Sequence, residues 1–204
     1  MLSFTFHPIT VFIAGVISTI AGITLYFGSI ADENESQSQA LDYQAALFQT
    51  DALGPDPETP KEKAAIERFT KYLKNIYNVR HIKSETSNVY APTAYFNDTL
   101  ATHRGIVDIE KYYISVADAM STYQLNIQDI SRSGSDHYIR WEMVFSSPQL
   151  SKGELIHTVG ITQVRFDKEG KVLLHRDFWD SGQNIYSHIR ILGGMVKTVN
   201  KFMQ

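Results

Sequence analysis

Apolar residues change their spacing after Met120, and this change limits the possible folds more than any other pattern in the chain. Before Met120 they recur every three to four residues, as on one face of a helix. After it they alternate with polar residues, as along a strand with one buried face. The order predicts helices followed by long strands, which is typical of an α+β domain.

Besides a short helix from Leu41 to Leu53 within the tether, two helices are expected before the change and one at the C-terminal end. The first covers residues 60–78, where Thr59 and Glu62 form a capping box and Pro60 suits the first helical position. The others cover Val107–Met120 and residues from about 189 to 202. The apolar face of the first helix consists of Ile66, Phe69, Leu73, Ile76 and Tyr77.

Long strands separated by polar turns fill most of the region from residue 122 to residue 180. Strands of this length must bend and twist, so we expect a strongly curved antiparallel sheet that cups the N-terminal helices. A cup with an apolar lining is also a ligand pocket. The expected strands are Thr122–Arg132, His137–Ser146, Glu154–Asp167 and Lys171–Asp180.

Charge divides the chain into three parts. Residues 1–31 carry no Asp, Glu, Lys or Arg, and residues 32–60 carry seven acids and no Lys or Arg. Residues 61–204 hold all 19 basic residues. We therefore predict an anchor or signal segment at 1–31, an acidic tether at 32–60 and a domain at 61–204. The net charge of −3 argues against a nucleic-acid partner.

Residues 9–30 form an uncharged apolar run whose helix would be roughly 33 Å long, enough to cross a hydrocarbon core of about 30 Å. The alternatives are a cleaved secretory signal ending near Ala31 and a helix of a soluble core. The length of the run favours a single-pass membrane anchor. We expect the domain to lie outside the cytoplasm, or to be secreted or periplasmic after cleavage near Ala31.

The chain contains no cysteine, which excludes disulfides, thiolate nucleophiles and zinc–cysteine sites. It also lacks a phosphate-binding glycine loop and a serine-centred elbow. His157 and His175 show no metal-ligand spacing. No cofactor and no metal are therefore expected.

Two short stretches, Tyr95-Phe96-Asn97-Asp98 and His175-Arg176-Asp177-Phe178-Trp179-Asp180, resemble the SnoaL-like branch of the nuclear-transport-factor-2-like superfamily. The resemblance covers roughly residues 62–186 and implies a cone-shaped α+β half-barrel with a deep pocket. Members of the superfamily include isomerases, polyketide cyclases, dehydratases, epoxide hydrolases and non-catalytic binding modules. The fold alone does not select among these functions.

Limonene epoxide hydrolases give a closer comparison. Arg140-Trp141-Glu142 is similar to their Arg-x-Asp motif and Tyr95-Phe96-Asn97 to their Tyr-x-Asn motif. Arg176-Asp177-Phe178-Trp179-Asp180 is similar to the Arg-Asp-Tyr-Phe-Asp of their last strand. The resemblance implies that Tyr95, Asn97 and Glu142 hold and deprotonate a water. It also implies that Arg140 bridges two carboxylates and that Asp177 protonates the epoxide oxygen. An acid and a base acting together are what one-step epoxide opening needs. Glu142 departs from the motif by one methylene.

The alternation of side chains leaves other interpretations open. Trp141 and Met143 share one face of their strand, so Arg140 and Glu142 on the other face are a solvated pair if the apolar face points inward. Asp177 is either a pocket residue or a surface partner of Arg176. His175, Asp177 and Trp179 share a face. If this face points into the pocket, His175 would act either as a general acid or base or as a structural hydrogen-bond partner, and Trp179 would contact the substrate.

Two classes of function follow. In the first, a membrane-attached domain binds a small apolar molecule in its cup, with cofactor-free acid–base catalysis of hydrolase or isomerase type as a further hypothesis. In the second, a non-catalytic accessory module uses Trp141 and Met143 on the outer sheet face to dimerise or to dock a partner. The expected partners are a small apolar ligand, a membrane through residues 9–30 and a second copy of the chain.

Overall fold

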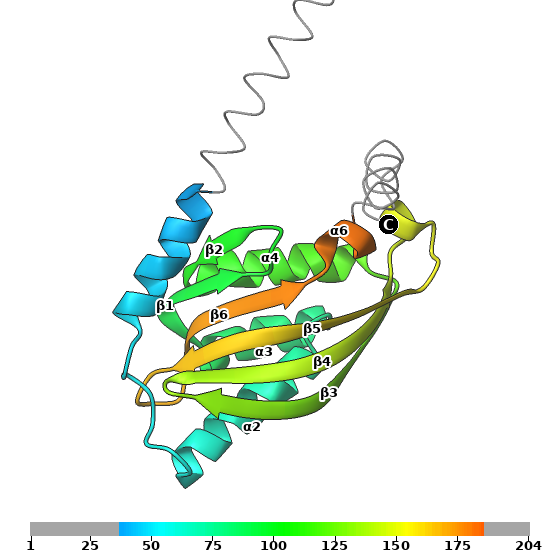
Figure 1. Cartoon of the computed structure of the whole chain (residues 1–204). Coiled ribbons are helices and arrows are strands. Elements are labelled where there is room, and N and C mark those ends of the chain that lie inside the picture. The colour runs from blue at the N-terminus through cyan, green and yellow to red at the C-terminus, as the bar shows by residue number, and fades with distance from the viewer. Residues whose placement is uncertain (1–36, 186–204) are drawn as a thin grey trace, which may run out of the picture. The chain divides into compact units, whose positions relative to one another are not determined.

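The structure is a computed structural model that describes residues 37–185 (Figure 1). The predicted anchor at 9–30 and the predicted helix at 189–202 lie outside the described residues. Within residues 37–185, no helix has both the length and the apolar character needed to cross a membrane. The chain divides into two compact units, residues 1–45 and residues 46–204.

Three long helices precede most of the sheet: α2 (Pro60–Lys74), α3 (Val79–Val89) and α4 (Gly105–Ala119). The predicted helices at 60–78 and 107–120 are confirmed as α2 and α4. Helix α3 was not predicted, because only Ile82, Thr86 and Val89 are buried on it and one of these is polar. Two helices of four residues each, α5 (Pro148–Ser151) and α6 (Ser181–Asn184), follow later in the chain.

Helix α2 begins at a capping box, and Glu62 of this box also bonds to side chains of the sheet. Thr59 Oγ1 accepts a hydrogen bond from the backbone N–H of Glu62, and Glu62 Oε2 accepts one from the backbone N–H of Glu58. The other oxygen of this buried carboxyl lies 2.8 Å from His137 Nε2 and 2.9 Å from Arg132 Nε. Burial acts to raise the pKa of Glu62, but these bonds and charges outweigh it and lower the pKa. Glu62 thus ties α2 to the sheet.

Six strands form one sheet in the order β2-β1-β6-β5-β4-β3. All neighbouring pairs are antiparallel except β1 and β6, which are parallel, so the sheet is mixed and the expectation of a purely antiparallel sheet is wrong. The parallel pair arises because β1 enters the sheet from α3, without a hairpin. The strands are β1 (Tyr90–Asn97), β2 (Thr102–Arg104), β3 (Thr122–Ser133), β4 (Asp136–Ser146), β5 (Ile156–Phe166) and β6 (Val172–Trp179).

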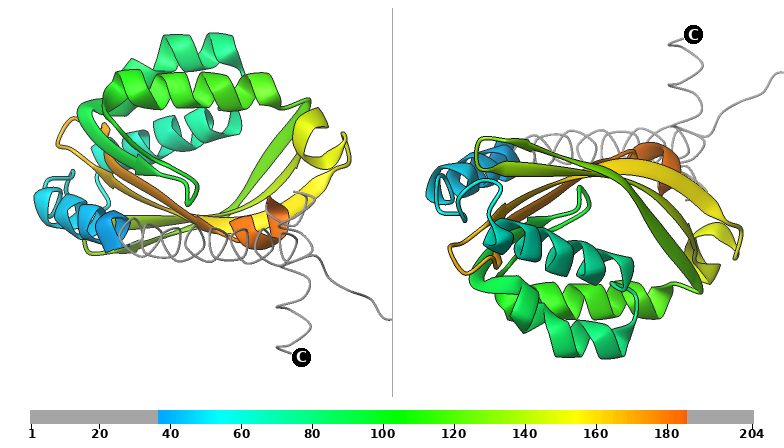
Figure 2. Two further views of the ribbon diagram at one scale, coloured as in Figure 1. Left: turned by 90° about the horizontal axis from the view of Figure 1, so that it is seen from above. Right: turned by 90° about the horizontal axis from the view of Figure 1, so that it is seen from below.

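The sheet is strongly curved and open, and α2, α3 and α4 lie on its concave side (Figure 2). A break in the β3–β4 register between Ile127 and Asp129 contributes to the bend. The main core lies between the helices and the sheet, around Phe69, Tyr90 and Phe166.

The convex side of the sheet holds the end of a preceding helix. Residues 37–49 are helical, and Ala46 is buried. Arg165, on the convex side of β5, donates a hydrogen bond from Nη1 to the carbonyl of Leu47 at 2.7 Å. Its Nη2 donates to Asp136 Oδ2 at 2.9 Å, and the charge of Arg165 helps to hold the pKa of Asp136 below its usual value despite burial. Residues 46–49 at the end of this helix are therefore fixed to the domain.

Candidate functional site

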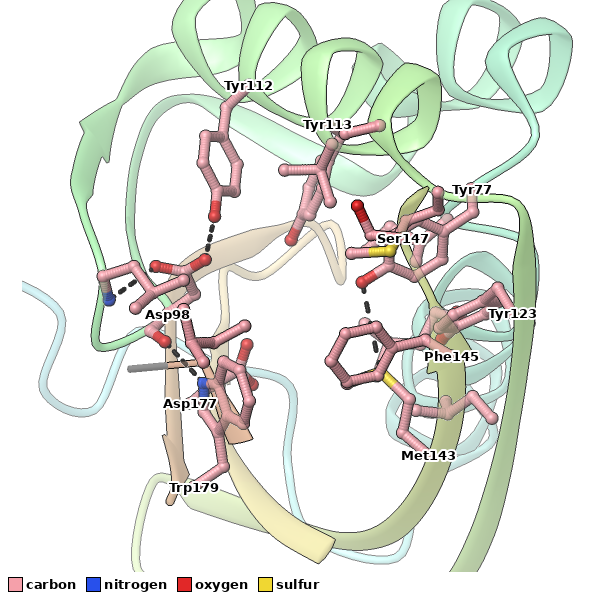
Figure 3. Close-up of a pocket in the computed structure, with 18 of the residues that line it drawn as sticks. Tyr77, Asp98, Tyr112, Tyr113, Tyr123, Met143, Phe145, Ser147, Asp177 and Trp179 are labelled. Atoms are coloured by element: carbon pink, nitrogen blue, oxygen red, sulfur yellow. Dashed lines mark hydrogen bonds between the residues drawn. The ribbon is translucent and has the colours of Figure 1, made fainter. Parts of the chain in front are cut away.

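A cavity of about 390 Å³ lies between α4 and the concave side of β3, β4 and β6 (Figure 3). This volume is within the range of small-molecule sites. Most of the wall is aliphatic or aromatic. The aromatic side chains that line it are Tyr77, Tyr112, Tyr113, Tyr123, Trp141, Phe145 and Trp179.

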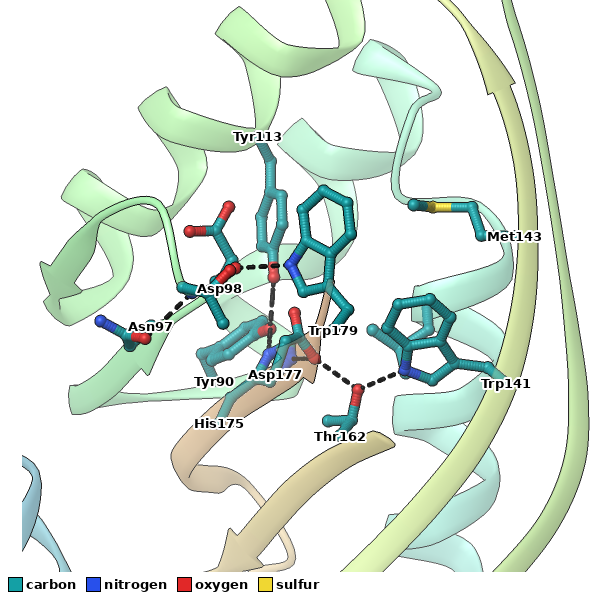
Figure 4. Close-up of polar contacts among 12 residues, drawn as sticks. Tyr90, Asn97, Asp98, Tyr113, Trp141, Met143, Thr162, His175, Asp177 and Trp179 are labelled. Atoms are coloured by element: carbon teal, nitrogen blue, oxygen red, sulfur yellow. Dashed lines mark hydrogen bonds and ion pairs between the residues drawn. The ribbon is translucent and has the colours of Figure 1, made fainter. Parts of the chain in front are cut away.

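A hydrogen-bonded chain centred on Asp177 forms one polar part of this wall (Figure 4). Trp141 Nε1 donates to Thr162 Oγ1 at 2.9 Å. Because an indole N–H can only donate, Thr162 accepts this bond and donates its own proton to Asp177 Oδ1 at 2.5 Å. His175 Nε2 lies 3.0 Å from the same oxygen. Asp177 Oδ1 therefore accepts two hydrogen bonds.

The same network assigns the tautomer of His175, a side chain that is only 1% exposed. If Nε2 carries the proton donated to Asp177, then Nδ1 of the neutral ring is an acceptor. Nδ1 lies 2.7 Å from the hydroxyl of Tyr90 and 3.5 Å from that of Tyr113. Tyr90 supplies the proton for this bond. His175 thus orients Asp177, as the carboxylate–histidine pairs of many sites do.

A second carboxyl group, Asp98, reaches the cavity from the turn after β1. Its Oδ1 accepts hydrogen bonds from the backbone N–H groups of Leu100 at 2.9 Å and Ala101 at 3.0 Å, and its Oδ2 accepts one from Tyr112. Burial raises the pKa of Asp98, these hydrogen bonds counteract it in part, and the charge of Asp177 adds to the rise. Asp98 therefore holds a proton more readily than an exposed aspartate.

The tyrosines around the cavity keep their protons. Burial is the main cause that raises the pKa values of Tyr77, Tyr113 and Tyr123, and the negative charge of Asp177 contributes at each of them. These hydroxyl groups therefore remain neutral at physiological pH. They cannot supply a phenolate base, and the hydroxyl of Tyr123 already donates its proton to the backbone carbonyl of Leu73 at 3.0 Å.

Gly160 on β5 makes room for Trp141. A Cβ at this position would lie 2.4 Å from Cζ2 of Trp141 and 3.0 Å from the carbonyl oxygen of Phe178. The indole ring of Trp141 therefore lies over β5 at Gly160, where a larger residue would clash with it. This close approach aligns Trp141 Nε1 with Thr162, two residues further along β5.

The structure does not bring Arg140 and Glu142 to Asp177. Both lie on the convex side of β4, where Arg140 pairs with Asp129 across the strand pair and Glu142 accepts a hydrogen bond from Gln128. The reason is the alternation of β4, whose apolar residues point inward. The arginine-bridged carboxylate pair of the epoxide hydrolases is therefore not assembled from these residues.

The alternation of β4 also corrects the expectation that Trp141 and Met143 lie on the outer face of the sheet. Trp141 and Met143 line the cavity and are buried, so a docking surface on the convex side does not contain them. The exposed apolar residues of the convex side are Val159, Ile161 and Phe178.

Of the other predicted residues, His175, Asp177 and Trp179 line the cavity, and Tyr95 and Asn97 do not. On β1 the core-facing residues are Ala94 and Phe96. Tyr95 and Asn97 therefore point to the other side, where the Arg104 guanidinium lies 5.1 Å from the Tyr95 ring. Asn97 Nδ2 donates to Thr102 Oγ1 and stabilises the turn.

Sequence reasoning missed the site roles of Asp98, Tyr112, Tyr113 and Thr162. Asp98 stood at the end of a quoted motif, but its direction depends on the turn from residue 98 to residue 101. Thr162 lies on the inward face of β5 and could have been found from strand alternation. Among residues 37–185, no group of three or more His, Asp or Glu side chains could hold a metal ion.

Comparisons with known proteins agree with this architecture. Residues 66–175 match the family model described as "Uncharacterized conserved protein (DUF2358)". No curated protein matches the sequence significantly.

Solved structures with SnoaL-like folds are similar to this one. A candidate SnoaL-like polyketide cyclase from Shewanella putrefaciens CN-32 has a TM-score of 0.52 at 18% identity, over 66% of this chain and 99% of that one. One from Jannaschia sp. CCS1 has a TM-score of 0.52 at 11% identity, over 61% of this chain and 91% of that one. An LEH-like epoxide hydrolase from M. tuberculosis has a TM-score of 0.49 at 16% identity, over 71% and 99% of the two chains. The predicted SnoaL-like fold is confirmed.

Proposed function

Since the chain belongs to the family of uncharacterized conserved proteins DUF2358, and has a SnoaL-like fold with an open cup, we propose that it binds a small, largely apolar molecule in that cup. We further propose that it acts on this molecule by cofactor-free acid–base chemistry of the isomerase or hydrolase type. The observation that carries the proposal is the cavity itself, which combines apolar walls with two carboxyl groups. A few polar groups in an apolar pocket are the usual composition of a small-molecule site.

The two carboxyl groups suit opposite tasks in a proton transfer. Asp177 uses Oδ1 for its bonds to Thr162 and His175, which leaves Oδ2 to take a proton from carbon or from water. Asp98 has a raised pKa and shares a hydrogen bond with Tyr112, so this pair can donate a proton to a substrate oxygen. In an isomerase the proton returns to another carbon. In a hydrolase the activated water becomes part of the product.

Binding is tested by filling the cavity. Ala119 lines the cavity from α4, and Ala119→Phe should abolish binding of the neutral fluorescent probe N-phenyl-1-naphthylamine by occupying its space. Asp118→Phe is the matched control, since Asp118 is the preceding residue of the same helix and is exposed. Equal probe binding by wild type and Ala119→Phe would contradict the proposal.

Catalysis is tested with a general reaction of enolisable ketones. The wild-type protein should accelerate the incorporation of solvent deuterium into 2-tetralone, followed by proton NMR. Asp177→Asn should reduce the rate by about 100-fold or more, the usual contribution of a general base. Glu142→Gln, on the exposed convex side, should leave the rate unchanged. If the wild-type protein exchanges deuterium no faster than buffer alone, or if Asp177→Asn exchanges it as fast as wild type, the proposal of catalysis is contradicted and only binding remains.

We also propose that residues 9–30 attach the protein to a membrane as a single-pass anchor, with the tether at 32–60 leading to the domain at 61–204. The domain would lie outside the cytoplasm, or be released by cleavage near Ala31. The support is the run of 22 uncharged residues. Retention in the membrane fraction after carbonate extraction is expected. A mature protein that begins at Asp32 would favour the cleaved signal.

The convex side of the sheet supports a second candidate function, as an accessory module that dimerises or docks a partner. Val159 is 66% exposed and Ile161 and Phe178 are each 41% exposed. Ile161 and Phe178 are direct neighbours across β5 and β6. If two copies associate here, Ile161→Asp should convert a dimer into a monomer in sedimentation experiments. A monomeric wild type would exclude the homodimer.

A further inference from the structure

The carboxyl groups of the cavity wall have no basic counterpart. Asp98 and Asp177 both line it, whereas no Lys or Arg lines it among the residues that the structure describes. His175 is the remaining ionisable group that could be cationic, but both of its ring nitrogens are already hydrogen-bonded within the protein. An anionic ligand would therefore find no positive partner in this cavity.

Aromatic carbon surrounds these carboxyl groups. The N–H group of Trp141 is used by Thr162, and that of Trp179 by the backbone carbonyl of Asp98 at 2.7 Å. Since both indole donors are bound to protein acceptors, the two rings present their carbon surfaces to the cavity (Figure 4). Indole is the aromatic ring that attracts cations most strongly.

Asp177 keeps one oxygen free for a ligand. Both of its hydrogen bonds, from Thr162 and from His175, end on Oδ1. None of the described residues donates a hydrogen bond to Oδ2, which lies on the side of Trp179 and Tyr113 in Figure 4. The Asp177 side chain is 18% exposed, so Oδ2 is accessible from the cavity and can pair with a ligand that supplies a positive charge.

The negative charge of Asp177 is felt across the whole cavity. It contributes to the raised pKa values of Tyr77 and Tyr123, which stand on the side of the cavity near β3 and the end of α2. Among the described residues that line the cavity, no Lys or Arg stands near this charge. A neutral apolar ligand would displace water from this charge without replacing its solvation.

We infer that the ligand of this cavity is an apolar molecule with a cationic nitrogen, either a protonated amine or a quaternary ammonium, held at Asp177 between Trp141 and Trp179. This inference rests on the proposed small-molecule function and narrows it to one charge class. The apolar part of the ligand would lie against Met143, Phe145 and their neighbours. Aromatic rings combined with carboxylates are the usual receptors for organic cations.

The test uses three probes of similar size and different charge, measured by calorimetry on the full chain. They are the cation (4-hydroxyphenyl)trimethylammonium, its uncharged isostere 4-tert-butylphenol, and the anion 4-hydroxybenzoate. The cation should bind at least about tenfold more tightly than the isostere, and the anion should not bind. Asp177→Asn should remove most of the preference for the cation and leave the affinity for the isostere within about twofold. Glu142→Gln is the matched control and should change neither affinity.

The outcomes separate this inference from the proposed function. If the isostere binds as tightly as the cation, or if Asp177→Asn weakens both equally, the cavity binds small molecules without selecting cations and the inference is overturned. If none of the three probes binds while N-phenyl-1-naphthylamine does, the inference is overturned and the proposed function stands; if that probe also fails to bind, the small-molecule pocket itself is refuted. The wild-type comparison alone is decisive, so the test does not depend on the folding of the Asn variant.

Discussion

Replacing Gly160 with alanine would directly test how the sheet positions Trp141. The new Cβ would lie 2.4 Å and 2.5 Å from two carbons of the indole ring and 3.0 Å from the carbonyl oxygen of Phe178. Ordinary carbon–carbon contacts are about 3.5–4.0 Å, so the ring must move by about 1 Å or more. Trp141 is buried and its Nε1 is bonded to Thr162, so this movement breaks a hydrogen bond.

The cost can be built from these two effects. Overpacking a core position costs about 1–3 kcal/mol, and the lost hydrogen bond adds about 0.5–1.5 kcal/mol. We expect the free energy of unfolding of Gly160→Ala to fall by about 2–4 kcal/mol. For a domain of this size, the midpoint of thermal unfolding should fall by about 4–16 °C.

The assay is urea unfolding followed by far-ultraviolet circular dichroism on four proteins: wild type, Gly160→Ala, Trp141→Phe and the double variant. Phenylalanine lacks the two indole carbons that meet the new methyl group. Alanine at position 160 should therefore cost at least about 1 kcal/mol less in the Trp141→Phe background than in the wild-type background. Part of the cost remains in both backgrounds, because the contact with the Phe178 carbonyl is unchanged.

Two results would refute this reasoning. One is a Gly160→Ala protein within about 0.5 kcal/mol of wild type, the range of ordinary surface substitutions. The other is an equal cost of the alanine in the wild-type and Trp141→Phe backgrounds. Val159→Ala, at the exposed neighbouring position, is the control and should cost less than about 1 kcal/mol.

Three further predictions concern other parts of the domain. Glu62→Gln should lower the free energy of unfolding by about 1–3 kcal/mol at pH 7. Because the pKa of Glu62 is lowered on folding, its contribution to stability is complete above about pH 4.5 and is lost as the pH falls through the folded pKa. The free energy of unfolding of the variant, measured in urea, should therefore depend less on pH in the acid range than that of wild type. Tyr112→Phe removes the hydrogen bond that lowers the pKa of Asp98, so this pKa should rise further in a ¹³C NMR titration. Arg165→Ala should cost about 1.5–3 kcal/mol, because the half-buried Asp136 loses its charged partner and keeps the hydrogen bond from Gln163, and it should speed limited proteolysis near residues 46–53.

Controls and contrary results are available for each of these three. An acid dependence of Glu62→Gln identical to that of wild type would show that Glu62 does not carry this part of the stability. An unchanged or lower pKa of Asp98 in Tyr112→Phe would contradict the assigned direction of that hydrogen bond. Arg140→Ala, at an exposed ion pair, should cost less than about 1 kcal/mol. If Arg165→Ala costs no more than this control, Arg165 does not hold the preceding helix.

The sequence predicts the elements that carry their own periodicity. Helices α2 and α4 and strands β3 to β6 follow from apolar spacing, because one face of each packs on the main core. Helix α3 and strands β1 and β2 do not. The buried residues of β1 form contiguous runs and include both Tyr95 and Phe96, so no alternation identifies the strand. Its parallel pairing with β6 depends on tertiary packing that no local pattern records.

Sequence patterns also do not predict the direction of every side chain in the candidate site. Strand alternation places Arg140 on the face opposite Trp141 and Asp177 on the same face as His175, but it does not say which face points inward. The short motifs pointed to Arg140 and Glu142 because a motif specifies residue types without specifying which face is buried. Asp98 enters the cavity through a turn, and its direction follows from backbone hydrogen bonds that the sequence does not reveal.

The position of the two tryptophans has an optical consequence. The chain contains two tryptophans, Trp141 and Trp179, and both line the cavity. All indole emission from this protein therefore originates at the cavity wall, with no background from tryptophans elsewhere in the chain. A change in its wavelength or quantum yield would report directly whether water or a ligand fills the cup. Unlabelled protein can thus be screened for ligands by its own fluorescence.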